Sequence, residues 1–255
     1  MTKESPHNIN YNLKKSLTIN DYISPGDRMF AGDRDHYLAV GQSALDCISV
    51  SMLAAKIETF TDILDMASGH GRVLRYLHAA FPEARLTACD VETEAVDFCA
   101  HTFGATPVYA EELPNDTALP GTYDLIYVGS LLTHLNEKRC IEFLDFFRKA
   151  LRKNGLLLFT MHGRFVARRM RESTATYGLR AEAIPGLLHD YETNGFGYVN
   201  YPTEAKFGVF DNYGISVVSP RWVFAKLEKL EDIRLVNFTE SGWDNHQDVV
   251  ACLRA

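Results

Sequence analysis

The chain has 255 residues, of which 46% are hydrophobic and 23% charged. This is ordinary usage for a soluble globular protein, and the length is enough to bury a sizeable core. The formal net charge is −7, and the densest basic stretch is the short run 168–171, which disfavours a nucleic acid as partner because nucleic-acid binders carry a basic stripe or patch.

The termini and the cysteines narrow the class of protein further. The first residues lack the apolar core of a signal peptide, and no uninterrupted apolar run approaches the length of a membrane span. The five cysteines form no CxxC pair, so we expect buried, reduced thiols and no metal site. The sequence therefore predicts a cytoplasmic protein without a membrane segment.

The middle of the chain alternates short apolar runs with longer helical patterns, which predicts an α/β fold with a parallel sheet and crossover helices. A helix over about 36–55 precedes this alternation. Gly104 is a predicted helix end, and Asn136 is a predicted N-cap. The expected strands are 63–66, 84–89, 107–109, 123–128 and 156–160, and the expected helices are 71–80, 93–103 and 137–152.

The alternation breaks after the fifth strand. Residues 163–218 are rich in Gly, Tyr and Asn, with strand-like stretches at 197–201 and 214–218. Ser219 and Pro220 then open a helix that continues to about residue 230. Two last strands are expected near 233–238 and 249–253.

These patterns predict three parts. Residues 1–58 form an N-terminal helical cap, and residues 59–255 form the main domain. Within it, residues 163–218 are an insertion whose many aromatic side chains favour a lid over a ligand cleft. A hydrophobic insert packed on the sheet, or a contact with a second subunit in a homodimer, is the alternative.

The strongest functional signal is the stretch 63–72, a strand that turns through small residues into a helix. Small residues let the backbone approach a ligand closely, and the helix start offers free N–H groups. Asp90 follows Gly71 by 19 residues, a spacing at which an acid can bind ribose hydroxyls. Arg72 stands where a dinucleotide fingerprint has its third glycine, which disfavours a dinucleotide. Asp65, directly before the turn, suits a ligand that carries a cationic amino group.

This stretch resembles the first motif of class I S-adenosylmethionine-dependent methyltransferases, an acid followed by GxGxG, with Ala67 in place of the first glycine. The resemblance covers about residues 60–160. It implies a Rossmann-like, doubly wound fold whose seven-stranded, mostly parallel sheet has an antiparallel last strand. It also implies S-adenosylmethionine as the cofactor.

The resemblance implies specific roles around this cofactor. Asp65 would face the methionine end, and Asp90 would bind the ribose. Val91 would pack on the adenine, and Glu111 or Glu112 could lie near the adenine amino group, with solvated surface acids as the alternative. The complete set of expected cofactor residues is Asp65, Ala67, Ser68, Gly69, Gly71, Asp90, Val91, Glu111, Glu112, Gly129 and Ser130.

The acceptor is expected at the carboxyl ends of the parallel strands, where ligands of open α/β sheets bind. His134, His162 and His246 follow different strands and are predicted to face this cleft together as candidate catalytic residues. A hydroxyl acceptor gains from a base that titrates near neutrality, so the histidines favour O-methylation. Purely structural histidines remain the alternative for each. A three-histidine metal site is disfavoured because no two share a short spacing.

The flanking regions supply further candidates for acceptor binding: His36, Tyr37 and Trp243. The last residues resemble a bacterial methyltransferase subgroup that modifies sugars or small metabolites. We therefore expect a methyltransferase for a small molecule or a sugar or glycan precursor. The alternatives are a non-catalytic S-adenosylmethionine- or nucleoside-binding regulatory or assembly protein, a protein or tRNA methyltransferase, and an aminopropyl-transferring enzyme.

Overall fold

The computed structural model describes residues 17–202 and 212–255. A seven-stranded sheet in the order β3-β2-β1-β4-β5-β9-β8 is its centre. β1 to β5 are parallel, and β9 runs antiparallel to both of its neighbours. This confirms the predicted fold class. The strands are β1 (Asp62–Met66), β2 (Arg85–Asp90), β3 (Thr106–Tyr109), β4 (Tyr123–Val128), β5 (Leu151–Met161), β8 (Ile233–Trp243) and β9 (Gln247–Arg254).

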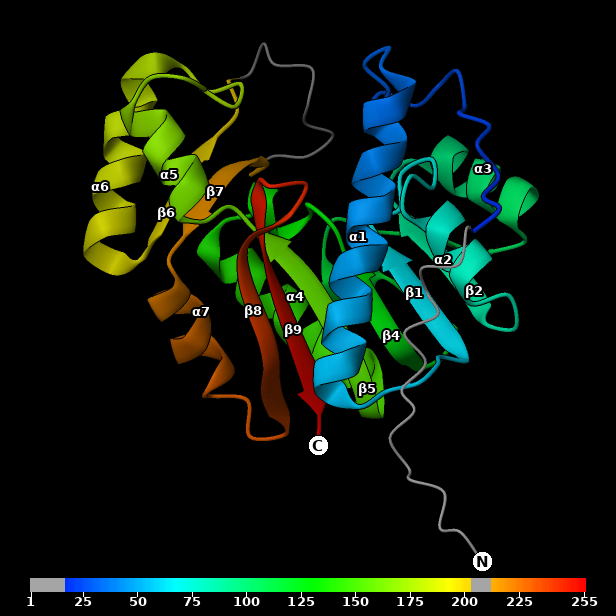
Figure 1. The fold of residues 1–255 in the computed structure, drawn as a ribbon. Helices are drawn as coiled ribbons and strands as arrows, with labels where there is room; N and C mark the ends of the chain where they lie inside the picture. The colour runs from blue at the N-terminus through cyan, green and yellow to red at the C-terminus, as the bar shows by residue number, and fades with distance from the viewer. Residues whose placement is uncertain (1–16, 203–211) are drawn as a thin grey trace, which may run out of the picture.

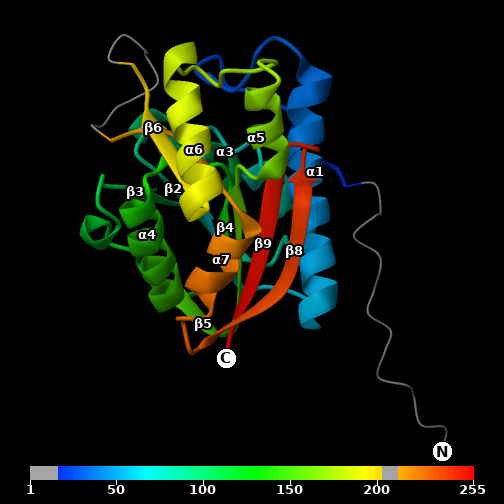
Figure 2. The ribbon, with the colours of Figure 1, turned by 90° about the vertical axis from the view of Figure 1, so that its left-hand side faces the viewer.

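Helices cover both faces of this sheet. α1 (Arg34–Ala55), α2 (Leu74–Ala80) and α3 (Thr93–Phe103) lie on one face, and α4 (Glu137–Ala150) and α7 (Pro220–Leu227) on the other (Figures 1 and 2). Because the central strands are buried on both faces, their sequences are nearly continuous apolar runs. The two apolar layers place the sheet rigidly beneath the loops at its carboxyl edge.

α1 differs from the sequence expectation about membranes. By length and composition, Arg34–Ala55 is apolar enough to cross a membrane, although no long uninterrupted apolar run marks it in the sequence. In the structure it lies along the sheet, and Val40, Leu45 and Ile48 are buried in the core. Core helices of soluble proteins have the same composition, and packing on the sheet accounts for the buried apolar face of α1, while Val50 on its other side is exposed.

Several predicted element ends are confirmed by their caps. The Asn136 side chain accepts a hydrogen bond from the Arg139 N–H, the Ser219 side chain accepts one from the Trp222 N–H, and Gly104 ends α3 in the left-handed conformation. The predicted start of the second helix at residue 71 is wrong. Gly71 has φ +73°, so the turn continues and α2 begins at Leu74.

The insertion contains more regular structure than its sequence suggested. β6 (Phe196–Asn200) and β7 (Gly214–Val218) form an antiparallel pair where strand-like stretches were expected. The sequence analysis did not predict α5 (Arg164–Arg171) and α6 (Ile184–Asn194). Signals for both exist: the buried residues of α5 recur at helical spacing, and α6 has a proline in its first turn and Gly195 at its end. These elements pack around their own apolar cluster beside the carboxyl edge of the sheet (Figure 1).

Candidate functional site

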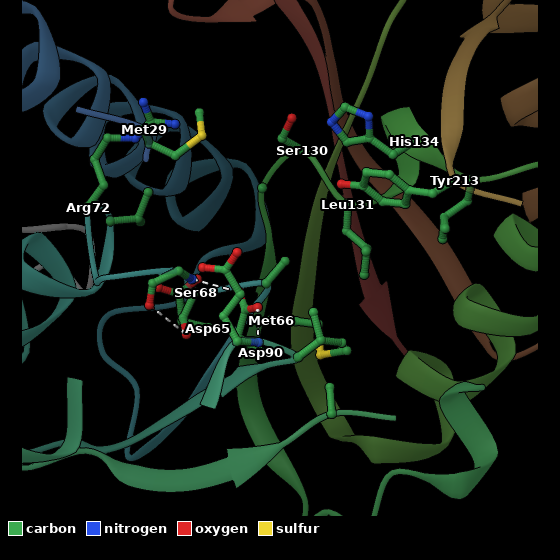
Figure 3. Close-up of a pocket in the computed structure, with 18 of the residues that line it drawn as sticks. Met29, Asp65, Met66, Ser68, Arg72, Asp90, Ser130, Leu131, His134 and Tyr213 are labelled. Carbon is green, nitrogen blue, oxygen red and sulfur yellow. Dashed lines mark hydrogen bonds between the residues drawn. The ribbon is translucent and has the colours of Figure 1, made fainter. Parts of the chain in front are cut away.

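A cavity of about 680 Å³ lies at the carboxyl ends of the parallel strands. Its wall combines segments that are distant in sequence: the N-terminal stretch 27–29, the β1–α2 loop, the ends of β2 and β3, the β4–α4 connection, and parts of the insertion and of β8 (Figure 3). Of the expected cofactor residues, the cavity is lined by Asp65, Ala67, Ser68, Gly69, Asp90, Val91, Glu111, Glu112, Gly129 and Ser130.

Gly71 is the expected cofactor residue that does not line this cavity. A Cβ at Gly71 would lie 2.7 Å from the Phe103 ring, and its φ is +73°. Gly69 also has a positive φ, but a Cβ there would meet open space. Gly71 is therefore needed for backbone conformation and for packing of the loop against α3, and the expectation of direct ligand contact is corrected.

The loop is fixed to the second strand. The N–H groups of Ala67 and Ser68 both donate to the Cys89 carbonyl, at 2.8 and 3.2 Å. Asp90 accepts hydrogen bonds from the Gly69 N–H at 2.8 Å and from the Glu92 N–H at 3.0 Å, one on each oxygen. Carboxylate oxygens have further lone pairs, so Asp90 holds the loop and keeps acceptor capacity toward the cavity.

Asp65 is the more deeply buried of the two acids, and one of its oxygens lacks a hydrogen-bond partner. Its side chain is 2% exposed, and its Oδ2 is buried without a hydrogen-bond partner in the described structure. Burial, together with the nearby Asp90 charge, raises the pKa of Asp65 to about 8. An unpartnered buried carboxyl oxygen close to a second acid favours the binding of a cationic group.

Glu111 and Glu112, expected near the adenine or as surface acids, both line the cavity. Glu112 pairs with Arg139 at 2.9 Å, and the Glu111 N–H donates to the Thr117 hydroxyl at 2.9 Å. Arg139 and Phe143, both from α4, also line the cavity. Glu112 is thus already compensated by a cation, whereas Val91 presents an apolar contact.

Ser130 lies where β4 leaves the sheet, in a left-handed conformation with φ +59°. Its N–H donates to the Thr160 hydroxyl at 2.8 Å, and its Oγ accepts from the Gln247 side chain at 3.0 Å. Thr160 of β5 and Gln247 of β9 therefore hold this turn in place.

The three predicted histidines come together, but not as expected. The ring centroids of His134 and His162 are 6.4 Å apart, and those of His162 and His246 are 5.7 Å apart. Among the three, His134 lines the cavity. His162 is 4% exposed behind it and hydrogen-bonds through Nδ1 to the Ser216 carbonyl at 3.2 Å, and His246 packs beside Tyr177. The expectation that all three face one cleft is therefore wrong for His162 and His246.

Their electrostatics separate them as well. Burial lowers the pKa of His134, partly opposed by its hydrogen bond to the Gly214 carbonyl. Burial, with the neighbouring His134 and His246, lowers the pKa of His162 to about 3. His246 is less buried, and burial also lowers its pKa. All three rings are thus held toward their neutral forms.

The expected acceptor contacts divide in the same way. Trp243 lines the cavity, and its indole N–H donates to the Val40 carbonyl at 3.0 Å. Tyr37 is buried behind the wall, where its hydroxyl donates to Asp27 at 2.5 Å, and Asp27 lines the cavity in its place. His36 is exposed beside Asp244. Direct contact by His36 or Tyr37 is therefore not what the structure shows.

The comparisons with known proteins agree with this geometry. Residues 64–157 match the family described as Methyltransferase domain, a span that contains the loop and both acids. No curated protein sequence matches the chain. Residues 64–157 are a methyltransferase domain, and the sheet order is that of the class I, S-adenosylmethionine-dependent methyltransferase fold.

Solved structures share the fold of this methyltransferase at low sequence identity. An S-adenosylmethionine-dependent methyltransferase from Clostridium acetobutylicum superposes with a TM-score of 0.57 at 13% identity, over 84% of this chain and 92% of that one. The DhpI complex with S-adenosylhomocysteine gives 0.54 at 15%, over 89% and 90%. Human N-acetylserotonin methyltransferase in complex with S-adenosylmethionine gives 0.52 at 16%, over 84% of this chain and 51% of that one. The chain thus covers nearly the whole length of two of these neighbours and about half the length of the third.

The cavity fits the cofactor of the methyltransferase. The unpartnered oxygen of Asp65 suits an ammonium or sulfonium charge, and Asp90 keeps acceptor capacity for hydroxyls. The described residues contain no group of three or more His, Cys, Asp or Glu side chains placed to hold a metal ion.

Several residues in the wall of the cavity were not named individually as site residues from the sequence. They come from the N-terminal stretch, the β1–α2 loop, β4 and the insertion, and they include Asp27, Arg28, Met29, Arg72, Tyr127, Tyr201 and Tyr213. Tyr127 stands opposite Asp65 in the β1–β4 register, a pairing that is visible only in the folded sheet. The tyrosines of the insertion did have a signal, the aromatic density that favoured a lid, although the position of Tyr213 depends on the tertiary placement of β7.

Proposed function

We propose that this methyltransferase methylates a hydroxyl group of a small molecule, with His134 as the general base. The observation that carries the proposal is the placement of His134. It lines the acceptor side of the cavity, on the same side as Ser130 and stacked on Tyr213 (Figure 3).

Hydrogen bonding fixes the tautomer of His134. Its Nδ1 lies 2.9 Å from the Gly214 carbonyl oxygen. A carbonyl only accepts, so Nδ1 carries the proton and Nε2 carries the lone pair. The Tyr201 hydroxyl, 3.2 Å from the same Nδ1, lies on the donor side of the ring. His134 therefore presents a neutral base at Nε2.

The burial that lowers the pKa of His134 keeps this base unprotonated at neutral pH. When bound, S-adenosylmethionine supplies a methyl group on a positively charged sulfur that leaves as a neutral thioether. His134 would take the hydroxyl proton as the new oxygen–carbon bond forms. The remaining residues orient the two reactants and exclude water.

The size and lining of the cavity favour a small acceptor. Aromatic and apolar side chains from Met29, Leu131 and Tyr213 surround the space above the cofactor loop, as is usual for small-molecule sites. Structural neighbours include the mitomycin 7-O-methyltransferase, with a TM-score of 0.50 at 14% identity over 83% of this chain and 54% of that one. We propose that the insertion 163–218 and the segment 1–58 serve as the acceptor-side cover, since described residues of both reach the cavity.

The test is a screen of hydroxyl-bearing metabolites, including sugars and phenols, scored by release of S-adenosylhomocysteine. Each hit is compared with its deoxy and its amino analogue. Turnover of the hydroxyl compound, with none of the deoxy analogue, supports the proposal. Turnover of the amine alone would replace O-methylation by N-methylation.

A further inference from the structure

Two neighbouring strands each bring a residue with an unpartnered oxygen to the wall of the cavity. Asp65 on β1 and Tyr127 on β4 are partners in the parallel register, and both line the cavity. Asp65 Oδ2 and the Tyr127 hydroxyl are buried, and neither has a hydrogen-bond partner in the described structure. Buried polar groups are nearly always hydrogen-bonded in folded proteins, so the pair indicates a ligand with both a donor and an acceptor.

The position of the Tyr127 hydroxyl is fixed by its surroundings. The Tyr127 and Trp243 rings pack edge to face with centroids 6.2 Å apart. A Cβ at Gly129 would lie 3.0 Å from the Tyr127 hydroxyl oxygen, so a larger residue there would crowd the hydroxyl. Gly129 therefore leaves room around an immobile O–H donor.

Arg72 adds a cation to the same part of the wall. Its guanidinium carbon lies 5.8 Å from the centroids of both the Tyr37 and the Trp243 rings. The other two arginines of the wall are neutralised, because Arg28 pairs with Glu92 and Arg139 pairs with Glu112. Within the described structure, no acid is placed to pair with Arg72. Aromatic packing thus holds in place a guanidinium whose charge is uncompensated.

Tyr127 interacts electrostatically with both Asp65 and Arg72. Burial and the nearby Asp65 charge raise the pKa of Tyr127 well above its usual value, and Arg72 partly opposes this. Figure 3 shows Arg72 above the loop that carries Ser68, with Asp65 below it. The wall of the cavity therefore offers an acceptor, a neutral donor and a cation.

We propose that Arg72 and the Tyr127 hydroxyl bind the carboxylate of the cofactor's amino-acid end, while Asp65 accepts its ammonium group. A guanidinium and a hydroxyl donor complement a carboxylate, and a buried carboxyl oxygen complements an ammonium. Arg72 directly follows the last glycine of the loop, and Tyr127 comes from β4. The inference rests on the methyltransferase assignment, and it is independent of O-methylation and of His134.

A consequence is selection against a decarboxylated cofactor. Decarboxylated S-adenosylmethionine keeps the sulfonium and the ammonium but lacks the carboxylate. It would leave Arg72 and Tyr127 without a partner, and unpaired buried polar groups weaken binding. The site thus distinguishes a methyl donor from the donor that aminopropyl transfer requires.

The experiment measures the affinity of the purified chain for S-adenosylmethionine and for its decarboxylated analogue by calorimetry, without any acceptor. The variants are Arg72→Gln and Tyr127→Phe. Arg164→Gln and Tyr198→Phe are the matched controls, because Arg164 pairs with Glu240 and Tyr198 bonds to Asn200, both away from the cavity lining.

The native protein and both controls are expected to bind S-adenosylmethionine at least about tenfold more tightly than the analogue. Each cavity variant should lose most of this preference while its affinity for the analogue changes less than about twofold. Retained binding of the analogue also shows that the variants are folded. Equal affinities in the native protein, an undiminished preference in both variants, or an equal loss toward both ligands would each overturn the proposal.

Discussion

The two sides of the cavity are built in different ways. Most of the cofactor side comes from one part of the chain, because Asp65, the glycine loop, Asp90 and Glu111 lie at the ends of the first three strands. Tyr127 of β4 adds to this side. The acceptor side comes from distant segments: Met29 precedes α1, His134 follows β4, and Tyr213 precedes β7. The cofactor side is therefore defined by local sequence and the acceptor side by tertiary packing.

Their polar groups differ as well. On the cofactor side, Asp65 and Tyr127 hold buried oxygens without partners. On the acceptor side, the polar groups of Ser130 and His134 are bonded to neighbouring strands. The unpartnered oxygens of the cofactor side favour the binding of a charged ligand. The hydrogen bonds of the acceptor side hold the His134 ring in one orientation. The predictions below test this difference.

The largest effect is expected on the acceptor side. His134→Ala should lower the single-turnover rate by about 10²- to 10⁴-fold, the usual contribution of a general base. His246→Ala is the matched control, because His246 lies near His162 but does not line the cavity, and it should stay within a few-fold of the native rate. Equal losses in the two variants would mean that His134 acts through structure alone.

The pH dependence follows from the same residue. Because burial lowers the pKa of His134, its neutral form persists below the usual value of about 6.5. The native single-turnover rate should therefore be flat near neutral pH and fall only in acid. In the His134→Ala variant this acid limb should disappear. An acid limb that persists unchanged would assign it to another group.

The next effect concerns the glycine loop. Gly71→Ala should destabilise the fold by about 2–4 kcal/mol, since it combines a left-handed backbone with a Cβ that clashes. Gly69→Ala, where the Cβ meets open space, should cost only about 1–2 kcal/mol. Urea unfolding of both variants measures the difference. Equal losses would show that packing against Phe103 does not explain the requirement for glycine at position 71.

His162 provides a test of the buried histidine cluster. Its pKa is lowered to about 3, so below about pH 6.5 the unfolded chain takes up a proton that the folded chain does not. This residue's contribution to stability should fall by up to about 1.4 kcal/mol per pH unit as pH decreases from 6.5. When the pH is lowered from 7 to 5, the free energy of unfolding should therefore fall less for His162→Phe than for the native chain. His78→Phe, at an exposed position of α2, should behave like the native chain.

The smallest effect is the release of a proton from Asp65. With a pKa of about 8, this carboxyl is mostly protonated at pH 7. A cationic group bound beside it favours the ionised form. Binding of S-adenosylhomocysteine should therefore release close to one proton at pH 7, measured by calorimetry in buffers of different ionisation enthalpy. Asp65→Asn should release none, and equal release by the two proteins would contradict the assignment.

The sequence predicted the regular parts of the molecule for physical reasons. Alternating apolar runs determine buried parallel strands, and the residues Asn136, Gly104 and Ser219 mark helix ends through their capping chemistry. The cofactor side was predictable because one loop and one acid at fixed spacing lie within a single β–α–β unit. Arg72 was noticed only as a missing glycine, since its cavity role depends on the rings of Tyr37 and Trp243.

The acceptor side could not be predicted in the same way. His162 and His134 both follow strands that end at the same edge, yet one side chain is buried behind the wall and the other lines it. That choice depends on β7, whose carbonyls at Gly214 and Ser216 accept from the two rings. A pairing between segments some 50 to 80 residues apart leaves no mark in local sequence.

The central claim is that the cofactor side binds S-adenosylmethionine through Asp90, and one titration tests it most directly. The native protein, Asp90→Ala and the exposed control Asp97→Ala are titrated with S-adenosylhomocysteine. The native protein and the control should bind alike, and Asp90→Ala should bind about 10- to 100-fold more weakly, because a charged acceptor for the ribose hydroxyls is lost. No binding by the native protein, or undiminished binding by Asp90→Ala, would contradict the account.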